Sequence, residues 1–310
     1  MRVAVIGAGA MGSLLGGFLT LGDVDTVLVE KRREIIDAVR SRGITIIDGQ
    51  DRLRVKVNIV DDGEDAWPAD YALILVKSYH TRSAALEASK ALGDDGVAVT
   101  LQNGLGNVEV LADVLGYERV MAGVTTWGAT LLEPGVVRLG GRGYIRVGEL
   151  NGEHTKRVYN LVELLNKARL NASVSNNIMK DVWVKVAINA AINPITALTR
   201  ARNGEILGDS MLLELSLKAA RETAQVARAE GIDMPSEDEL DELVVNVMKA
   251  TSSNTSSMLQ DIINCRRTEI DAISGEIYRR GEARGLDVSV NKTLYTLVKN
   301  LESRSCRSLN

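Results

Sequence analysis

Short apolar runs alternate with longer segments of helical period along the first half of the chain. The apolar runs are rich in β-branched residues, and they lie at residues 3–6, 26–29, 72–76 and 97–101. Helix-like segments separate them at residues 11–21, 31–42, 82–92 and 108–115. Runs that are apolar at consecutive positions are typical of strands buried on both faces. The alternation therefore predicts an α/β fold with a doubly wound parallel sheet.

Strand-like runs follow one another without helices between residues 119 and 148. A Glu-Pro-Gly sequence at 133–135 separates the runs at 129–132 and 136–139. Proline and glycine at such a position are typical of a tight turn. We expect a hairpin here that extends the sheet.

The remainder of the chain has helical period almost throughout. Ser236 and Ser289 stand where helices would begin, and serine is a favourable N-cap. The expected helix stops are four glycines, Gly204, Gly208, Gly231 and Gly285. We predict an α/β domain at residues 1–174 and an all-helical domain at residues 175–310.

Length and composition agree with two folded domains and exclude several classes of protein. A chain of 310 residues exceeds the usual span of one hydrophobic core. Hydrophobic residues at 45% and charged residues at 25% are ordinary for globular proteins. The net charge of -4, with acids and bases interleaved, argues against a nucleic-acid partner. We expect a small-molecule partner instead.

The first residues of the chain, its apolar runs and its cysteines indicate in which cellular compartment the protein is expected. Residues 1–7 look like a first strand and lack the pattern of a signal peptide. No run approaches the roughly 20 apolar residues that span a bilayer. Cys265 and Cys306 are too few for a disulfide framework or a metal site. We therefore expect a cytoplasmic protein with no membrane association and no structural metal.

A glycine motif follows the first predicted strand and begins the first predicted helix. Its residues are Gly7, Ala8, Gly9, Ala10, Met11 and Gly12. In a Rossmann-type domain the first glycine permits a tight turn, the second admits a pyrophosphate, and the third allows helix and strand to pack closely. The helix N-terminus stabilises the bound anion. The motif in this context predicts a bound dinucleotide.

Two neighbouring features give opposite indications for the choice of dinucleotide. Glu30 ends the second predicted strand, eighteen residues after Gly12, where a carboxylate would accept hydrogen bonds from the ribose of NADH. Lys31, Arg32 and Arg33 follow at once and could hold the 2′-phosphate of NADPH. The basic run could equally be a solvated helix start. The preference between NADH and NADPH stays open at this point.

A polar stripe crosses an otherwise apolar helical segment. Lys185, Asn189 and Asn193 are spaced four residues apart, so they share one helix face. Buried amides and ammonium groups need partners, and a stripe of this kind faces either partners or a cleft. A carbonyl reductase needs a proton donor beside the developing alkoxide, and a lysine ammonium suits that task. Alternatively, Lys185 faces solvent and the asparagines bond to nearby backbone.

Several motifs stand together in one order and spacing. They are the glycine motif and the segments at residues 76–78, 102–104, 183–185, 189, 192–194, 203–204, 256–261 and 267–271. In these segments the chain resembles the ketopantoate reductase family over essentially its full length. The resemblance implies a Rossmann domain followed by a helical domain. It also implies reduction of 2-dehydropantoate to (R)-pantoate in a cleft between the domains, with hydride from a nicotinamide that is NADPH in most members.

The resemblance also assigns roles to individual residues. It implies that Lys185 gives its proton to the ketone oxygen. The positions that match substrate-binding residues are Asn189, Asn193, Asn203, Asn254 and Ser257. Those that match cofactor-binding residues, besides the glycine motif, Glu30 and Arg32, are Lys77, Asn103, Ala129 and Glu269. From composition alone, Glu269 would be a surface acid, and Lys77 and Asn103 an ordinary strand-end lysine and turn residue.

The chain departs from the family pattern at two residues, and two other functions are compatible with the sequence. Glu30 weakens the expectation of NADPH, and Trp127 falls at a variable position expected near the nicotinamide, where it would bear on substrate size. One rival is a reductase of another 2-keto acid or of an opine-type imine. The other is a non-catalytic dinucleotide sensor. The apolar helices leave open whether the chain forms a homodimer.

Overall fold

The first apolar run forms an inner strand of an eight-stranded sheet in the computed structural model, which describes residues 1–305. This strand, β1 (Arg2–Ile6), pairs in parallel with β2 (Asp25–Val29) and β6 (Ala69–Ile74). The strand order is β12-β11-β8-β7-β6-β1-β2-β5, with β8 and β11 antiparallel. The other strands are β5 (Asn58–Val60), β7 (Leu92–Thr100), β8 (Val120–Thr125), β11 (Ile145–Glu149) and β12 (Ala172–Val174).

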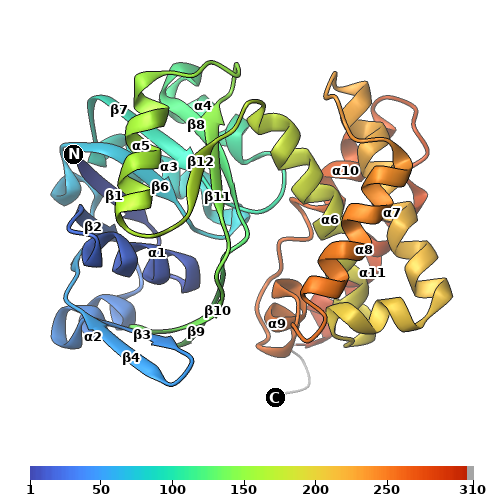
Figure 1. Ribbon diagram of the computed structural model, residues 1–310, viewed down its shortest axis with the longest axis horizontal. Coiled ribbons are helices and arrows are strands. Elements are labelled where there is room, and N and C mark those ends of the chain that lie inside the picture. Colours follow the sequence, from blue (N-terminus) through green and yellow to red (C-terminus); the bar gives the residue numbers. More distant parts are fainter. Residues whose placement is uncertain (306–310) are drawn as a thin grey trace. The chain divides into compact units, whose positions relative to one another are not determined.

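Helices cover both faces of this sheet (Figure 1). Successive side chains of a strand point to opposite faces. Accordingly, Val3 and Val5 join a core with α1, α2 and α5, whereas Ala4 and Ile6 join a core with α3 and α4. The helices are α1 (Ala10–Leu21), α2 (Arg33–Arg42), α3 (Thr81–Ala91), α4 (Asn107–Leu115) and α5 (Lys156–Lys167). The predicted doubly wound α/β fold is confirmed.

The predicted hairpin forms, but it does not extend the main sheet. Its strands β9 (Gly128–Glu133) and β10 (Val136–Gly141) belong to a separate sheet of order β4-β3-β10-β9. The partner strands are β3 (Ile44–Asp48) and β4 (Asp51–Val55). The small sheet covers α1: a methyl group at Gly17 of this helix would lie 2.8 Å from Ile46 Cδ1. The expectation of one continuous sheet was therefore wrong.

The second half of the chain is helical, as predicted. Its helices pack around their own core, with Trp183 among the fully buried side chains. Ser236 caps α8 in a capping box with Glu239, as predicted, whereas α11 begins at Ser289 itself. The elements are α6 (Ile178–Thr199), the 3₁₀ helix η4 (Asn203–Gly208), α7 (Ser210–Ala229), α8 (Glu237–Ala250), α9 (Ser257–Ile263), α10 (Ser274–Glu282) and α11 (Ser289–Ser305).

The chain divides into two compact units. The first unit holds Met1–Gln102 and Asn107–Ile178, and the second holds Asn103–Gly106 and the residues from Met179 onward. The boundary expected at 174 thus lies four residues before the break after Ile178. The short segment Asn103–Gly106 joins the helical unit, where the Leu105 N–H donates to the carbonyl of Ala272 at 2.8 Å. The two-domain prediction placed this segment in the first domain.

The length and apolar composition of α6 have to be compared with the expectation that no segment is long enough to span a membrane. Among the described residues it is the one helix long and apolar enough to cross a bilayer. The expectation that no segment approaches this length was therefore wrong. However, 61% of its most apolar stretch is buried within the protein, as in the central helix of a helical domain.

Candidate functional site

The glycine motif forms a tight turn between β1 and α1. Gly7 has φ of +97°, and a Cβ atom there would lie 2.6 Å from Val76 Cγ1. A Cβ atom on Gly12 would lie 1.7 Å from the carbonyl oxygen of Gly7. At Gly9, by contrast, the nearest atom to such a Cβ is Arg32 Nη2 at 3.9 Å. Gly7 and Gly12 are therefore required by packing, whereas Gly9 leaves its backbone open to a ligand.

The start of α1 suits an anion. Gly9 is its N-cap and makes no side-chain cap, and the first turn of the helix carries no acidic residue. The first N–H groups of a helix lack intrahelical partners and attract negative charge. The open backbone at Gly9 and this helix end together fit the pyrophosphate of a dinucleotide.

Glu30 does not offer its carboxylate to a ribose in this structure. Its Oε2 atom accepts from the Ala8 N–H at 2.9 Å and from Arg32 Nη2 at 2.7 Å. Its Oε1 atom accepts from the N–H groups of Lys31 and Arg32 and from Arg32 Nε, at 2.9–3.0 Å. Five donors occupy the two oxygens, which have about four lone-pair positions. Both carboxylate oxygens are thus occupied, and Glu30 cannot accept hydrogen bonds from the ribose of NADH, as was expected, unless one of these donors is displaced.

The same contacts decide the charge of this pair. Burial alone would raise the pKa of Glu30, but hydrogen bonds and attraction from Arg32 outweigh it and hold the pKa below its ordinary value. Arg32 is correspondingly kept protonated, with its pKa raised by the carboxylate. Its side chain is 49% exposed, against 6% for Glu30. The pair therefore presents a fixed guanidinium beside the glycine turn.

The rest of the basic run points to acids of the first unit. Lys31 forms an ion pair with Glu87 at 2.9 Å and donates to the carbonyl of Asp61 at 2.6 Å. Arg33 pairs with Asp61 at 3.5 Å. The backbone N–H of Lys31 bonds to Glu30, and α2 begins only at Arg33. Arg32 is thus the member of this run that approaches the glycine turn.

A glutamine that sequence reasoning left without a role braces the loop that carries Lys77. Gln102 Nε2 donates to the carbonyl of Val76 at 3.0 Å and to Thr81 Oγ1 at 2.9 Å. Thr81 in turn donates to Asn107 Oδ1 at 2.8 Å. Lys77 is half-buried and precedes the 3₁₀ helix η2 (Ser78–His80) after β6. The position of Gln102 in the motif at 102–104 was its only signal in the sequence.

Ala129 and Trp127 differ in how they fit the expected nicotinamide pocket. Ala129 lies on β9 opposite Leu139 of β10, and it is half-buried. Trp127 is 7% exposed and donates its Nε1–H to the carbonyl of Leu170 at 3.0 Å. Its ring packs against Phe18, with 5.7 Å between ring centroids. Trp127 is therefore a core residue of the first unit, and the expectation that it shapes the substrate pocket was wrong.

The polar stripe on α6 has the burial expected of a ligand-facing row. Lys185 and Asn189 are half-buried and Asn193 is 7% exposed. The amide nitrogen Nδ2 of Asn189 is buried and has no hydrogen-bond partner among the described residues. A buried amide without a partner costs free energy, so this atom marks a position where a ligand acceptor would fit.

Lys185 has an unusual ionisation. Burial lowers its pKa from 10.5 to about 8, although the carboxylate of Glu269 acts in the opposite direction. Glu269 is 6% exposed and lies near Asn103, whose Nδ2 is 3.5 Å from Glu269 Oε2. The helical unit thus holds Lys185 and Glu269 in one electrostatic environment, and Glu269 is not the surface acid that composition suggests.

Asn203 is hydrogen-bonded to a serine-rich tract at residues 251–257. Its backbone N–H donates to the carbonyl of Asn254 and its Nδ2 to Thr251 Oγ1, both at 3.0 Å. Its Oδ1 atom is buried without a hydrogen-bond partner among the described residues. The tract 251–257 is therefore a bonded loop and not a flexible linker. Within residues 1–305, two further buried polar atoms also lack a hydrogen-bond partner: Ser274 Oγ of α10 and Asn291 Oδ1 of α11.

The other members of the predicted substrate set are more exposed. The side chains of Asn254 and Ser257 both face solvent. Ser256, which received no role, is 5% exposed and caps α9 through the N–H of Leu259. It also accepts the hydroxyl of Thr196 on α6 at 2.7 Å. Ser256 therefore ties the tract to α6, and its place as an N-cap was a signal available in the sequence.

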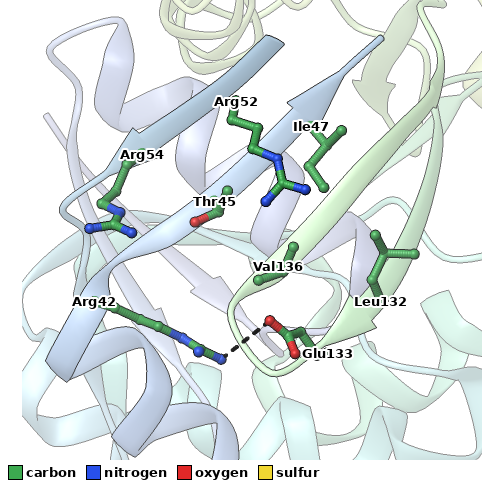
Figure 2. Close-up of a pocket in the computed structure, with 8 residues that line it drawn as sticks. All are labelled: Arg42, Thr45, Ile47, Arg52, Arg54, Leu132, Glu133 and Val136. Carbon is green, nitrogen blue, oxygen red and sulfur yellow. Dashed lines mark ion pairs between the residues drawn. The ribbon is translucent and has the colours of Figure 1, made fainter. Parts of the chain in front are cut away.

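A metal site and a surface hollow are the other kinds of site that these residues could form. Among residues 1–305, no group of three or more His, Cys, Asp or Glu side chains is placed to hold a metal ion. Cys306 lies outside the described residues. A hollow of about 450 Å³ lies over the small sheet, where Figure 2 shows Arg42, Arg52 and Arg54 around Thr45. None of the predicted site residues lines it.

Comparison with known proteins gives consistent matches along the chain. The family model described as "Ketopantoate reductase PanE/ApbA" matches residues 3–152, and that of its C-terminal part matches residues 177–302. A 2-dehydropantoate 2-reductase of Archaeoglobus fulgidus is 37% identical over 97% of this chain and 98% of its own. One from Pyrococcus horikoshii is 36% identical over 98% of each chain.

Solved structures give the same picture. A PanE/ApbA family ketopantoate reductase from Ralstonia eutropha JMP134 has a TM-score of 0.90 at 30% identity, covering 98% of this chain and 99% of its own. D-mandelate dehydrogenase in complex with NADH has a TM-score of 0.91 at 25% identity, with the same coverage.

Proposed function

The chain belongs to the ketopantoate reductase family, and from this premise we propose how it reduces 2-dehydropantoate to (R)-pantoate, a step toward pantothenate and coenzyme A. A nicotinamide cofactor supplies the hydride when it is bound. The observation that carries the assignment of residues is the stripe on α6. There an ammonium of lowered pKa stands one turn from the buried Asn189 Nδ2, which has no hydrogen-bond partner in the part of the chain that the structure describes.

Lys185 is the proposed proton donor. An ammonium group whose pKa is about 8 is still mostly protonated at neutral pH, and it loses its proton more readily than an ordinary lysine. Its positive charge would also stabilise the alkoxide that forms as hydride reaches the carbonyl carbon. Glu269 keeps this group protonated near neutral pH by raising its pKa against the effect of burial.

Amide groups of the helical unit would hold the substrate. The buried Asn189 Nδ2 supplies a donor for a carboxylate oxygen, and the buried Asn203 Oδ1 supplies an acceptor for a hydroxyl group. Asn193 would add a second amide on the face of α6 that carries Asn189. Asn254 and Ser257, both exposed, complete the proposed set from the tract and the start of α9.

NADPH is the proposed cofactor. Glu30 has both carboxylate oxygens occupied by protein donors, so a ribose would have to displace one of them. Arg32 is half-exposed and fixed beside Gly9, where a guanidinium suits a phosphate. We propose that it binds the 2′-phosphate, with Lys77, Asn103, Ala129 and Glu269 as further cofactor contacts.

A panel of 2-keto acids tests the substrate assignment. Initial rates with ketopantoate, pyruvate and phenylglyoxylate, each with NADPH and with NADH, give kcat/KM for every pair. We expect the largest value for ketopantoate with NADPH. Preference for phenylglyoxylate would favour a second candidate function, the reduction of bulkier keto acids. The structural similarity to D-mandelate dehydrogenase suggests this alternative. Absence of cofactor oxidation with every acid would favour a sensor.

A Lys185→Ala variant tests the proton donor in the same assay. We expect turnover to fall by about 10²–10⁴-fold, the usual contribution of a positioned acid. Cofactor binding, measured by nicotinamide fluorescence, should change little. Near-normal turnover would contradict the assignment.

The cytoplasmic location expected from the sequence stays a prediction, and so does the homodimer.

A further inference from the structure

Glu269 carries a buried carboxylate on a stretch of chain that is neither helix nor strand. It lies between α9 and α10, and its side chain is 6% exposed. Its backbone carbonyl accepts from the N–H groups of Ala272 and Ile273, at 3.0 and 3.1 Å. The residues on each side of Glu269 also help to fix where the carboxylate points, because they hold the backbone of the loop.

The residue before Glu269 is held by α11. The backbone N–H of Thr268 donates to Glu302 Oε1 at 2.7 Å, and its hydroxyl donates to the same atom at 2.5 Å. Thr268 is fully buried, and its hydroxyl oxygen also accepts from the Ile270 N–H at 3.2 Å. Glu302 thus fixes both the backbone and the side chain on this flank.

The flank that follows Glu269 is held by the same helix. Asp271 accepts from Lys299 Nζ and from the Tyr295 hydroxyl, both at 3.1 Å. Lys299 also forms an ion pair with Glu302 at 3.1 Å, which connects the two flanks. Tyr295, Lys299 and Glu302 are four and three residues apart, so they share one face of α11.

We infer that Lys299 and Glu302 are positioning residues for the reaction, because they hold the loop that carries Glu269 from both sides. The inference rests on the proposed role of Glu269 at the site. These groups are partly buried, with side-chain exposures of 34%, 28% and 12% for Lys299, Asp271 and Glu302. Solvent therefore screens this network less than an ordinary surface ion pair.

A matched pair of lysines on α11 tests this inference. Lys299→Met removes the bridge between the flanks. Lys292→Met removes an ion pair of the same helix, with Glu282, that involves no residue of the loop and is more exposed. We expect Lys299→Met to lower kcat/KM by about tenfold, since small misplacements of a site group cost up to about 10²-fold. Lys292→Met should leave kcat/KM unchanged, and Lys299→Arg should restore most of the activity.

A double mutant separates positioning from stability. If Lys299 acts through Glu269, Lys299→Met should cost little further activity in a Glu269→Gln background, although each single variant is impaired. Thr268→Val, which keeps the shape and removes the hydroxyl, should change the same kinetic parameter as Glu269→Gln. Unfolding temperatures of all variants show that the proteins measured are folded.

Three outcomes would overturn the inference. Normal kcat/KM in both Lys299→Met and Thr268→Val would do so while leaving the proposed function intact. Fully additive losses in the double mutant would show that Lys299 acts independently of Glu269. Normal activity of Glu269→Gln would instead remove the proposed role of Glu269, and the inference with it.

Discussion

At the scale of single residues, the ionisation of Lys185 connects structure with rate. A general acid works in its protonated form, so reduction should lose activity as pH rises through the pKa of the free enzyme. Burial places that pKa at about 8. An ordinary lysine would stay protonated across the whole neutral and mildly alkaline range.

The pH profile of kcat/KM should therefore be level below pH 8 and decline above it. Glu269→Gln removes the carboxylate that raises the pKa of Lys185, so the decline should begin at a lower pH. Steady-state rates between pH 6 and 10 measure both profiles. A profile that stays level to pH 9.5 would mean that Lys185 is not the titrating acid.

Arg32 should set the preference between NADPH and NADH. Arg32→Ala should lower the ratio of kcat/KM for NADPH to that for NADH by about 10–100-fold, because a hydrogen bond to a charged group contributes about 1.5–3 kcal/mol. Arg33→Ala is the control, since Arg33 is the neighbouring arginine and pairs with Asp61. An equal loss in both variants would point to general surface charge.

Single residues also show where sequence reasoning stops. The stripe of Lys185, Asn189 and Asn193 was predictable because helix periodicity alone brings these residues together. The engagement of Glu30 was not, since one of its partners is the Ala8 N–H, 22 residues away. Trp127 was misplaced for the same reason: Phe18 and Leu170, which are distant in sequence, surround it.

At the scale of elements, the packing of α1 on β1 depends on glycine. The Cβ of an alanine at position 12 would fall 1.7 Å from the carbonyl oxygen of Gly7, so backbone has to move. Movement there would disturb both the turn and the helix N-terminus that is proposed to hold the pyrophosphate.

Gly12→Ala should therefore abolish detectable NADPH binding and lower the free energy of unfolding. Gly141→Ala, on β10 of the same unit, is the control, because a Cβ atom there meets nothing within 4 Å. Fluorescence titration and urea unfolding measure the two effects. Normal cofactor affinity in Gly12→Ala would contradict the role given to the turn.

The elements of the first unit were predictable in unequal measure. α1, α3 and α4 begin and end within a residue of their predicted bounds, because their apolar period is local. The small sheet was not foreseen, since its pairing of β3 with β10 joins residues 45 and 136. The local signal for this pair of strands was the Gly49-Gln50 turn, which follows Asp48 between β3 and β4.

At the scale of the whole molecule, each unit has a hydrophobic core of its own. The glycine turn and Arg32 belong to the first unit, whereas Lys185 and Glu269 belong to the second. A ligand of the glycine turn should therefore stabilise mainly the first core. Scanning calorimetry is the measurement that resolves the two.

We expect two thermal transitions, of which NADPH raises one. At a hundredfold excess over Kd, a ligand adds about 2.7 kcal/mol to the free energy of unfolding, enough to shift a unit of this size by roughly 5–10 °C. The transition that NADPH raises should be the one that Gly12→Ala lowers. Equal shifts of both transitions would argue that the two cores unfold together.

The four residues Asn103–Gly106 have a consequence for exchanging halves between relatives. The chain leaves the first unit at Asn103 and returns to it after Gly106, and these four residues fit the loop after Glu269 closely: a Cβ atom on Gly104 would lie 2.6 Å from the carbonyl oxygen of Ala272. A chimera joined only at residue 178 would pair this small insert with a foreign surface. A recombinant of two parents should therefore inherit residues 103–106 from whichever parent donates the helices.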